Sequence, residues 1–209
     1  LNFERGGGPV DDDVVSCSFY CVVEALFLRC CAGRGDCVVG VDVDIDVDVG
    51  VDVDERDHVF IVHRNDASQF GGNTEIGLQG GVAECCTPAP PIIEFDAEGN
   101  VVNAWGGPVE GAPYVWPASN HGIEVAPNGD VWIGGNGGGD SHVLVFSRDG
   151  EYIRTIGMQG EGRDSNSKTH FARVAEIAID VEANEAYFAD GYQNRRVAVV
   201  DAFKKNHRG

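Results

Sequence analysis

The sequence is poor in basic residues. Lys and Arg number 15 against 34 Asp and Glu, a formal net charge of −19 over 209 residues. Nucleic acids bind surfaces that neutralise phosphates with Lys and Arg, so we expect no nucleic-acid partner. Methionine occurs once and not at position 1, which leads us to expect a fragment or a processed product. Seven cysteines, an odd number with two adjacent pairs, give neither a clear disulfide framework nor a usual zinc spacing.

Long apolar runs are also missing. The run from Val14 to Leu28 is interrupted by Glu24 and follows three aspartates rather than basic residues. A secretory signal begins with basic residues, and a transmembrane helix needs about 20 apolar ones. We therefore expect no clear signal sequence and no membrane association. We interpret residues 1–47 as a low-complexity, disordered N-terminal segment.

Two catalytic motifs are absent. The glycine-rich stretch Gly134 to Asp140 is not followed by Lys-Ser or Lys-Thr, which excludes a phosphate-binding loop of that kind. No Gly-x-Ser-x-Gly turn of a hydrolase is present. Runs that favour helices are scarce, whereas glycine is abundant at 29 residues. This composition favours an all-β protein with many turns.

Residues 40–54 alternate valine or isoleucine with aspartate. In a strand this pattern places the β-branched side chains on one face and the acids on the other. Two interpretations remain open: a comb of carboxylates that binds calcium, or low-complexity sequence whose last repeat serves as a strand. The register of such a strand is weakly specified, because a slip of two residues restores the same pattern.

Short strands joined by polar turns recur from residue 48 onwards. The predicted strands are 51–53, Val59–Val62, Ile92–Phe95, Val101–Trp105, a strand–turn–strand over 122–133, His142–Phe146, Tyr152–Ile156, Ile177–Asp180, Ala186–Ala189 and Arg196–Val200. Phe95 precedes Phe146 by 51 residues, and Ile123 precedes Ile177 by 54. Units of four antiparallel strands every ~40–50 residues are typical of propeller blades. We therefore predict an all-β fold over residues 48–209: a partial β-propeller of about three four-stranded blades, the last of them incomplete. The three tryptophans are expected to pack in blade cores.

The hairpin over residues 188–201 is the most informative stretch. Val197 and Val199 alternate with other positions, as in a strand with two distinct faces, and Gly191 and Asn194 suit the turn. Tyr192 lies on this turn, where its hydroxyl can be exposed. On hairpin evidence alone it is a surface tyrosine.

Several motifs resemble those of a known family. Asp190 to Val197 resembles the hairpin of NHL-repeat propellers. Three stretches, Gly50 to Arg64, His121-Gly122-Ile123, and Asp190-Gly191-Tyr192 with Asn194 and Arg196, resemble peptidyl-α-hydroxyglycine α-amidating lyase (peptidylamidoglycolate lyase) and its bacterial relatives. The resemblance implies NHL-type blades of a six-bladed propeller. It also implies cleavage of a peptidyl-α-hydroxyglycine to a peptide amide and glyoxylate, and a secreted or extracytoplasmic location.

The resemblance assigns roles to five residues. His121 falls on a zinc-ligand histidine, Arg64 on an active-site arginine that handles polar groups of the substrate, and Tyr192 on the catalytic tyrosine, proposed as the general base. Val51 and Ile123 fall on positions whose backbone carbonyls hold a structural calcium. Zinc and calcium are therefore the expected cofactors. The expected partner is a peptide or small molecule in the propeller channel.

The sequence departs from the family pattern in three places. The position after the tyrosine is Gln193 rather than cysteine, so that disulfide cannot form, and Asn65-Asp66 follow Arg64. Two further zinc histidines of the family lie in later blades, so we expect this chain to bind zinc weakly. The alternatives are a non-catalytic NHL propeller that binds a protein or small ligand, and an inactive truncated fragment. In both, His121 and Arg64 are ordinary surface residues.

Overall fold

The computed structural model describes residues 50–64 and 89–203 with their side chains, together with the backbone of five short strands. These are β1 (Cys17–Val22), β2 (Ala25–Cys31), β3 (Cys37–Val38), β4 (Asp42–Asp44) and β7 (Cys86–Thr87), which form one sheet. Much of residues 1–47 lies outside the described part of the chain, and so do Asn65 and Asp66. The predicted disorder of residues 1–47 stays a prediction.

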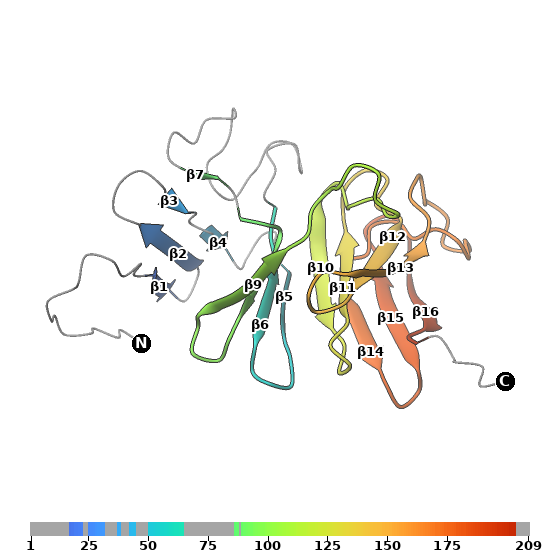
Figure 1. Cartoon of the computed structure of the whole chain (residues 1–209). Helices are drawn as coiled ribbons and strands as arrows, with labels where there is room; N and C mark the ends of the chain where they lie inside the picture. The colour runs from blue at the N-terminus through green and yellow to red at the C-terminus, as the bar shows by residue number, and fades with distance from the viewer. Residues whose placement is uncertain are drawn as a thin grey trace, which may run out of the picture.

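Three antiparallel sheets follow one another in chain order (Figure 1). Blade 1 contains β5 (Gly50–Val53), β6 (Val59–Val62), β8 (Ile92–Phe95) and β9 (Val101–Trp105). Blade 2 contains β10 (Asn120–Val125), β11 (Val131–Gly135), β12 (His142–Phe146) and β13 (Tyr152–Gly157). Blade 3 contains β14 (Ile177–Asp180), β15 (Glu185–Asp190) and β16 (Arg196–Asp201). The first strand of blade 2, β10, contacts both β5 and β14.

This architecture confirms the all-β class, with no helix among the described residues, in an arrangement compatible with a partial β-propeller. Within those residues, then, no helix is long and apolar enough to cross a membrane. The predicted strand bounds agree with the structure at β6, β8, β9, β12 and β14, and differ by one residue at some ends of β13, β15 and β16.

Glycines set the turns between the third and fourth strands of blades 1 and 2. Gly99 and Gly150, which lie 51 residues apart, have φ values of 84° and 86°. Glycine adopts these values without the steric penalty that a Cβ brings. The chain therefore reverses at equivalent points in the two blades, and in each blade this turn sets the register between the third and fourth strands.

Two apolar clusters hold neighbouring blades together. Blades 1 and 2 enclose a cluster that includes Phe60, Ile92, Trp116, Ile133 and Phe146, with Trp105 packed against it. Blades 2 and 3 enclose another that includes Trp132, Val145, Phe171, Ile177 and Phe188. The three tryptophans therefore pack in these clusters, as predicted.

The 188–201 hairpin does have two distinct faces, as predicted. Ala198 and Val200 pack against the cluster shared with blade 2. Val197 and Val199, by contrast, are 62% and 51% exposed on the opposite face. The face with these valines has no covering sheet among the described residues.

Candidate functional site

Two of the predicted site residues meet between blades 2 and 3. His121 lies in β10, and Tyr192 lies on the turn between β15 and β16, 71 residues later. The Tyr192 hydroxyl is 2.8 Å from Nε2 of His121. The two rings pack edge to face, with centroids 5.4 Å apart and an angle of 71° between their planes. The structure therefore brings together the predicted zinc ligand and the predicted catalytic tyrosine.

A backbone carbonyl sets the tautomer of His121. Its Nδ1 is 3.1 Å from the carbonyl oxygen of Ala175, at the start of blade 3. A carbonyl can only accept a hydrogen bond, so Nδ1 carries the proton and Nε2 of the neutral ring has the lone pair. The Tyr192 hydroxyl consequently donates to Nε2. A metal-ligating histidine has this same tautomer, with its other nitrogen bonded to a carbonyl or carboxylate.

A buried network holds the turn that carries Tyr192. Asp190 is fully buried and accepts hydrogen bonds from the backbone N–H of Ala172 (2.6 Å), Nδ2 of Asn194 (2.9 Å) and Nε of Arg196 (2.7 Å). The Arg196 guanidinium also donates to backbone carbonyls of the preceding loop, at Ser165, Ser167 and His170. The Asp-Asn-Arg part of the motif is thus a structural framework. Tyr192, 54% exposed, is the residue that this framework presents.

Asp140 holds the corresponding loop of blade 2. Its buried carboxylate accepts from the backbone N–H groups of Ala118 (2.8 Å), Ser119 (3.1 Å) and Gly137 (2.8 Å). Ala118 precedes Ala172 by 54 residues, the offset between the two blades. The carboxylate of Asp140, at the end of the glycine-rich stretch that begins at Gly134, therefore binds the loop that leads to His121. The sequence motifs include both aspartates, Asp140 and Asp190, but sequence reasoning assigned a structural role to neither.

Arg64 follows β6 in blade 1 and is almost fully buried, with 1% of its surface exposed. Its Nη2 donates to Oδ1 of Asn136 in the loop after β11, over 3.2 Å. Next to it, the His63 carbonyl accepts a 2.7 Å hydrogen bond from Nδ2 of Asn120, the neighbour of His121. Arg64 and His121 therefore lie at the same end of blades 1 and 2. The structure joins Arg64 to Asn136, however, and not to Tyr192.

The predicted calcium carbonyls lie on strand edges that face away from their own sheets. The N–H of Val125 donates to Asp52 of blade 1 rather than to β11. Residues two apart in an antiparallel strand present N–H and C=O to the same side, so the Ile123 carbonyl shares that edge. The N–H of Asp54 donates to the carbonyl of His58, the residue before β6, so Asp54 presents its backbone groups to the β6 side. Val51, an odd number of residues earlier, presents its N–H and C=O to the other side, the outer edge of β5.

The donor set tests the metal prediction. His121 fits the role of one zinc ligand, because its Nε2 has the lone pair. Within the described residues, no group of three His, Cys, Asp or Glu side chains is placed to hold a metal ion. A catalytic zinc needs three protein ligands. The predicted zinc and calcium sites both stay predictions.

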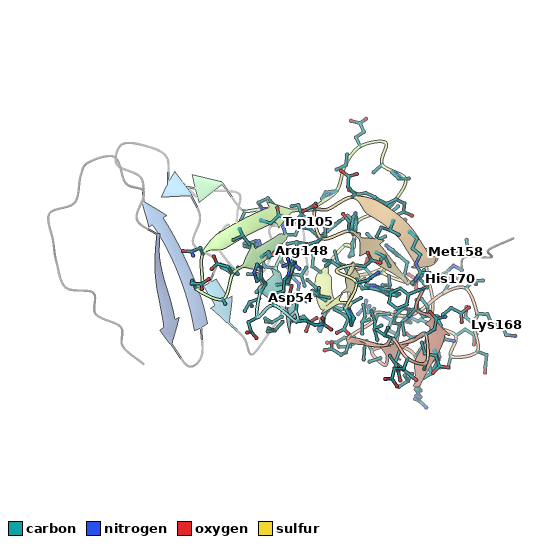
Figure 2. All side chains as sticks on the ribbon, turned by 60° about the horizontal axis from the view of Figure 1, so that its bottom comes forward. Asp54, Trp105, Arg148, Met158, Lys168 and His170 are labelled. Carbon is teal, nitrogen blue, oxygen red and sulfur yellow. The ribbon has the colours of Figure 1, made fainter. Side chains whose placement is uncertain are left out.

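The opposite end of blades 1 and 2 carries a cavity of about 680 Å³, lined mainly by acidic and polar residues of the turns there. Arg148 bridges the blades at this end: its Nη1 donates to Oδ2 of Asp54 over 2.6 Å (Figure 2). Its Nη2 donates to Glu94. Burial raises the pKa of Asp54, but hydrogen bonds from Arg148 and from the backbone N–H groups of His58 and Arg56 outweigh it and hold the pKa well below its usual range. These contacts hold blade 1 against blade 2, so we assign this end of the blades a structural role.

Comparisons with known proteins do not assign a family. No protein-family model and no curated protein matches the sequence. The crystal structure of a protein of unknown function from Bacteroides caccae matches this chain with a TM-score of 0.43 and 9% sequence identity. The alignment covers 89% of this chain and 64% of that one. This chain therefore spans less than two thirds of the length of that protein.

Proposed function

We propose that this chain forms part of an NHL-type propeller lyase that cleaves peptidyl-α-hydroxyglycine to a peptide amide and glyoxylate. One observation carries the proposal. The family resemblance assigns chemistry to His121 and to Tyr192 separately, and these side chains are joined by a 2.8 Å hydrogen bond between two blades. On the same resemblance we propose an extracytoplasmic location.

The chemistry needs a base at the substrate hydroxyl. Tyr192 takes the hydroxyl proton as the carbon–nitrogen bond breaks, which leaves the aldehyde of glyoxylate, and the departing amide nitrogen receives a proton. A phenol acts as a base only when a nearby cation or metal stabilises its phenolate. Arg64 handles the substrate carboxylate, to which a guanidinium can make a bidentate contact. The bond to Asn136 uses Nη2 alone among the nitrogens of the guanidinium, which has five N–H donors.

The resemblance implies zinc and calcium. Zinc polarises the substrate hydroxyl or carbonyl when bound, and His121 would supply one ligand through Nε2. The carbonyls of Val51 and Ile123 would face the calcium from the edges of β5 and β10. Their place at strand edges supports this assignment, because such carbonyls are not used by the sheet.

Glyoxylate release from a synthetic peptidyl-α-hydroxyglycine tests the proposal, with the protein in the full length that its gene encodes and with zinc supplied. Tyr192→Phe keeps the ring and removes the hydroxyl, so we expect kcat to fall by about 10²-fold or more. Tyr187→Phe is the matched control: Tyr187 lies in β15 of the same hairpin and bonds to Glu185. Full activity of Tyr192→Phe would exclude the proposed role.

A non-catalytic propeller that binds a protein or small ligand in its channel is the second candidate. The absence of a three-ligand metal cluster within the described residues favours it. It predicts that the wild-type protein holds no stoichiometric zinc and releases no glyoxylate. The lyase proposal predicts stoichiometric zinc and glyoxylate release.

A further inference from the structure

We propose that a crevice where the loops of blades 2 and 3 meet binds a small carboxylate, with Arg173 as its cation. The crevice has a volume of about 20 Å³ and is lined by the glycine turn 137–140 of blade 2 and by the loop 160–163 that follows it. Arg173, in the segment that leads into β14, lines it as well. This site does not depend on the lyase chemistry, because it is built from other residues.

The backbone of Arg173 has a conformation that arginine rarely adopts. Its φ is 70°, in the left-handed region. Asp57 and Asn184 are the other non-glycine residues with positive φ in the described part of the chain. Both lie in turns between strands, and aspartate and asparagine tolerate this region. In an arginine the same conformation costs free energy and persists only where the surroundings impose it, often at a functional site.

Two hydrogen bonds impose the conformation. The N–H of Ala172 donates to the buried carboxylate of Asp190 over 2.6 Å. The N–H of Arg173 itself donates to the carbonyl of Asp140 over 3.1 Å. The guanidinium takes no part, since within residues 50–64 and 89–203 it makes no hydrogen bond and no ion pair. The backbone contacts would hold equally well with another residue here, so the arginine side chain is available to a ligand.

The crevice has spare donors, whereas many of its acceptors are already used. The N–H groups of Gly138 and Gly139 have no acceptor among the described residues, and successive N–H groups in such a turn form a concavity that suits anions. The carboxylate of Asp140 already accepts three N–H groups. The carbonyls of Gly160 and Gly162 accept hydrogen bonds from side chains beside them. A guest must therefore accept hydrogen bonds, and the nearby guanidinium favours a negative charge.

The charged residues at the rim do not change this balance. Glu161 lies 4.0 Å from Nε of Arg163, and their side chains are 83% and 68% exposed, so the two charges offset each other in water. Nε of Arg163 also donates to Oε1 of Gln193 over 3.0 Å, which uses that acceptor. The cation without a partner is Arg173.

Size favours a carboxylate over a larger anion. A volume of about 20 Å³ holds roughly one group of the size of water. One carboxylate oxygen fits this space while the other meets the guanidinium, whose planar set of donors matches a carboxylate. Phosphate carries more oxygens than the crevice can hold. Gln193 lines the crevice and follows Tyr192 directly, so the ligand would bind beside the His121–Tyr192 pair.

Acetate is the probe, titrated into the ¹⁵N-labelled protein in the full length that its gene encodes and followed by NMR. The amide signals of Gly138 and Gly139 should shift and saturate. Arg173→Gln should weaken acetate binding about tenfold, as expected for the loss of a charge-assisted hydrogen bond. Arg195→Gln is the matched control: Arg195 is exposed at the same end, with no partner for its guanidinium among the described residues, and this variant should bind acetate as the wild type does.

Arg173→Gly separates a ligand role from a structural one. Glycine adopts a φ of 70° without strain and keeps the N–H that bonds to Asp140. This variant should therefore unfold at a higher urea concentration than Arg173→Gln and bind acetate as weakly. A lower urea midpoint for the glycine variant would show that the positive φ is not strained, which would overturn the inference.

The remaining outcomes are equally decisive. No shift of the glycine signals in the wild type, or acetate binding that neither Arg173 variant changes, would overturn the site. An equal response to phosphate or chloride at the same concentration would overturn its assignment to a carboxylate. None of these results bears on glyoxylate release by the wild type and Tyr192→Phe, which tests the lyase proposal separately.

Discussion

Asp52 of blade 1 accepts a 2.6 Å hydrogen bond from the backbone N–H of Val125 in blade 2. Glu124 repeats the arrangement one blade later with the N–H of Ile179, over 3.2 Å. In each case an acid on the first strand of one blade fixes the first strand of the next. Burial, together with the nearby charges of Asp52 and Glu176, raises the pKa of Glu124 to about 7.

Glu124 should make stability depend on pH. A carboxyl whose pKa is higher in the folded than in the unfolded chain stabilises the fold while protonated. Its contribution is complete below the ordinary pKa of 4.5 and is lost as pH rises through about 7. Between pH 5.5 and 8 we expect a loss of about 1 kcal/mol, reduced from the buried limit because water screens a part-exposed group.

Urea unfolding at both pH values checks this prediction, with Glu124→Gln compared to the wild type. The glutamine variant should lack this share of the pH dependence. Glu110→Gln, at an exposed loop position, should behave as the wild type does. A variant whose free energy of unfolding follows the wild-type pH profile would contradict the assignment.

Arg148→Met should destabilise the contact between blades 1 and 2. Asp54 and Glu94 would lose their shared partner, and their side chains are only 8% and 4% exposed. We expect a loss of about 3 kcal/mol, because a buried carboxylate without its cation is costly. Arg56→Met is the matched control: Arg56 binds the same Asp54 oxygen but is 58% exposed, so the loss should stay below about 1 kcal/mol. Similar losses for both variants in urea unfolding would show that burial does not decide the effect.

Asp190→Asn should loosen the turn that presents Tyr192. The amide removes a charge and a two-oxygen acceptor from three donors, which costs about 2–4 kcal/mol. The His121–Tyr192 hydrogen bond should weaken too, which labelled histidine and tyrosine signals would report. Asp149→Asn, on an exposed turn, is the control. Unchanged signals in Asp190→Asn would mean that the turn holds its shape without the carboxylate.

Gly135→Ala tests the carboxylate of blade 2. A Cβ at Gly135 would lie 2.5 Å from Oδ2 of Asp140 and 2.6 Å from Cβ of Pro117. We expect a loss of about 1–3 kcal/mol from overpacking. Gly138→Ala lies in the loop that follows β11, where a Cβ meets nothing within 4 Å, so it should have little effect on the unfolding midpoint.

The strands were predictable because their information is local. Short apolar runs and turn glycines mark the bounds of strands such as Val101–Trp105 without reference to distant sequence. The contact of Arg148 with Asp54 spans 94 residues and arises only when two blades pack. Asp140 gave no signal because it lies in a loop without strand periodicity. The family resemblance assigned roles to His121 and Tyr192 separately, and neither it nor any spacing in the sequence predicted their hydrogen bond.

The uncovered face of blade 3 has a consequence for handling the protein. Ala178, Tyr187 and Val199 lie side by side across its three strands. The corresponding positions of blade 2 include Trp132 and Val145, which are buried in the cluster shared with blade 3. Within residues 50–64 and 89–203, blade 3 therefore exposes in water a surface of the kind that blade 2 buries. Acidic residues border this face at Asp180, Glu185 and Asp201, and a net charge of −19 keeps copies apart. Near the isoelectric point of about 4.4 that repulsion disappears, and the chain should precipitate through this face.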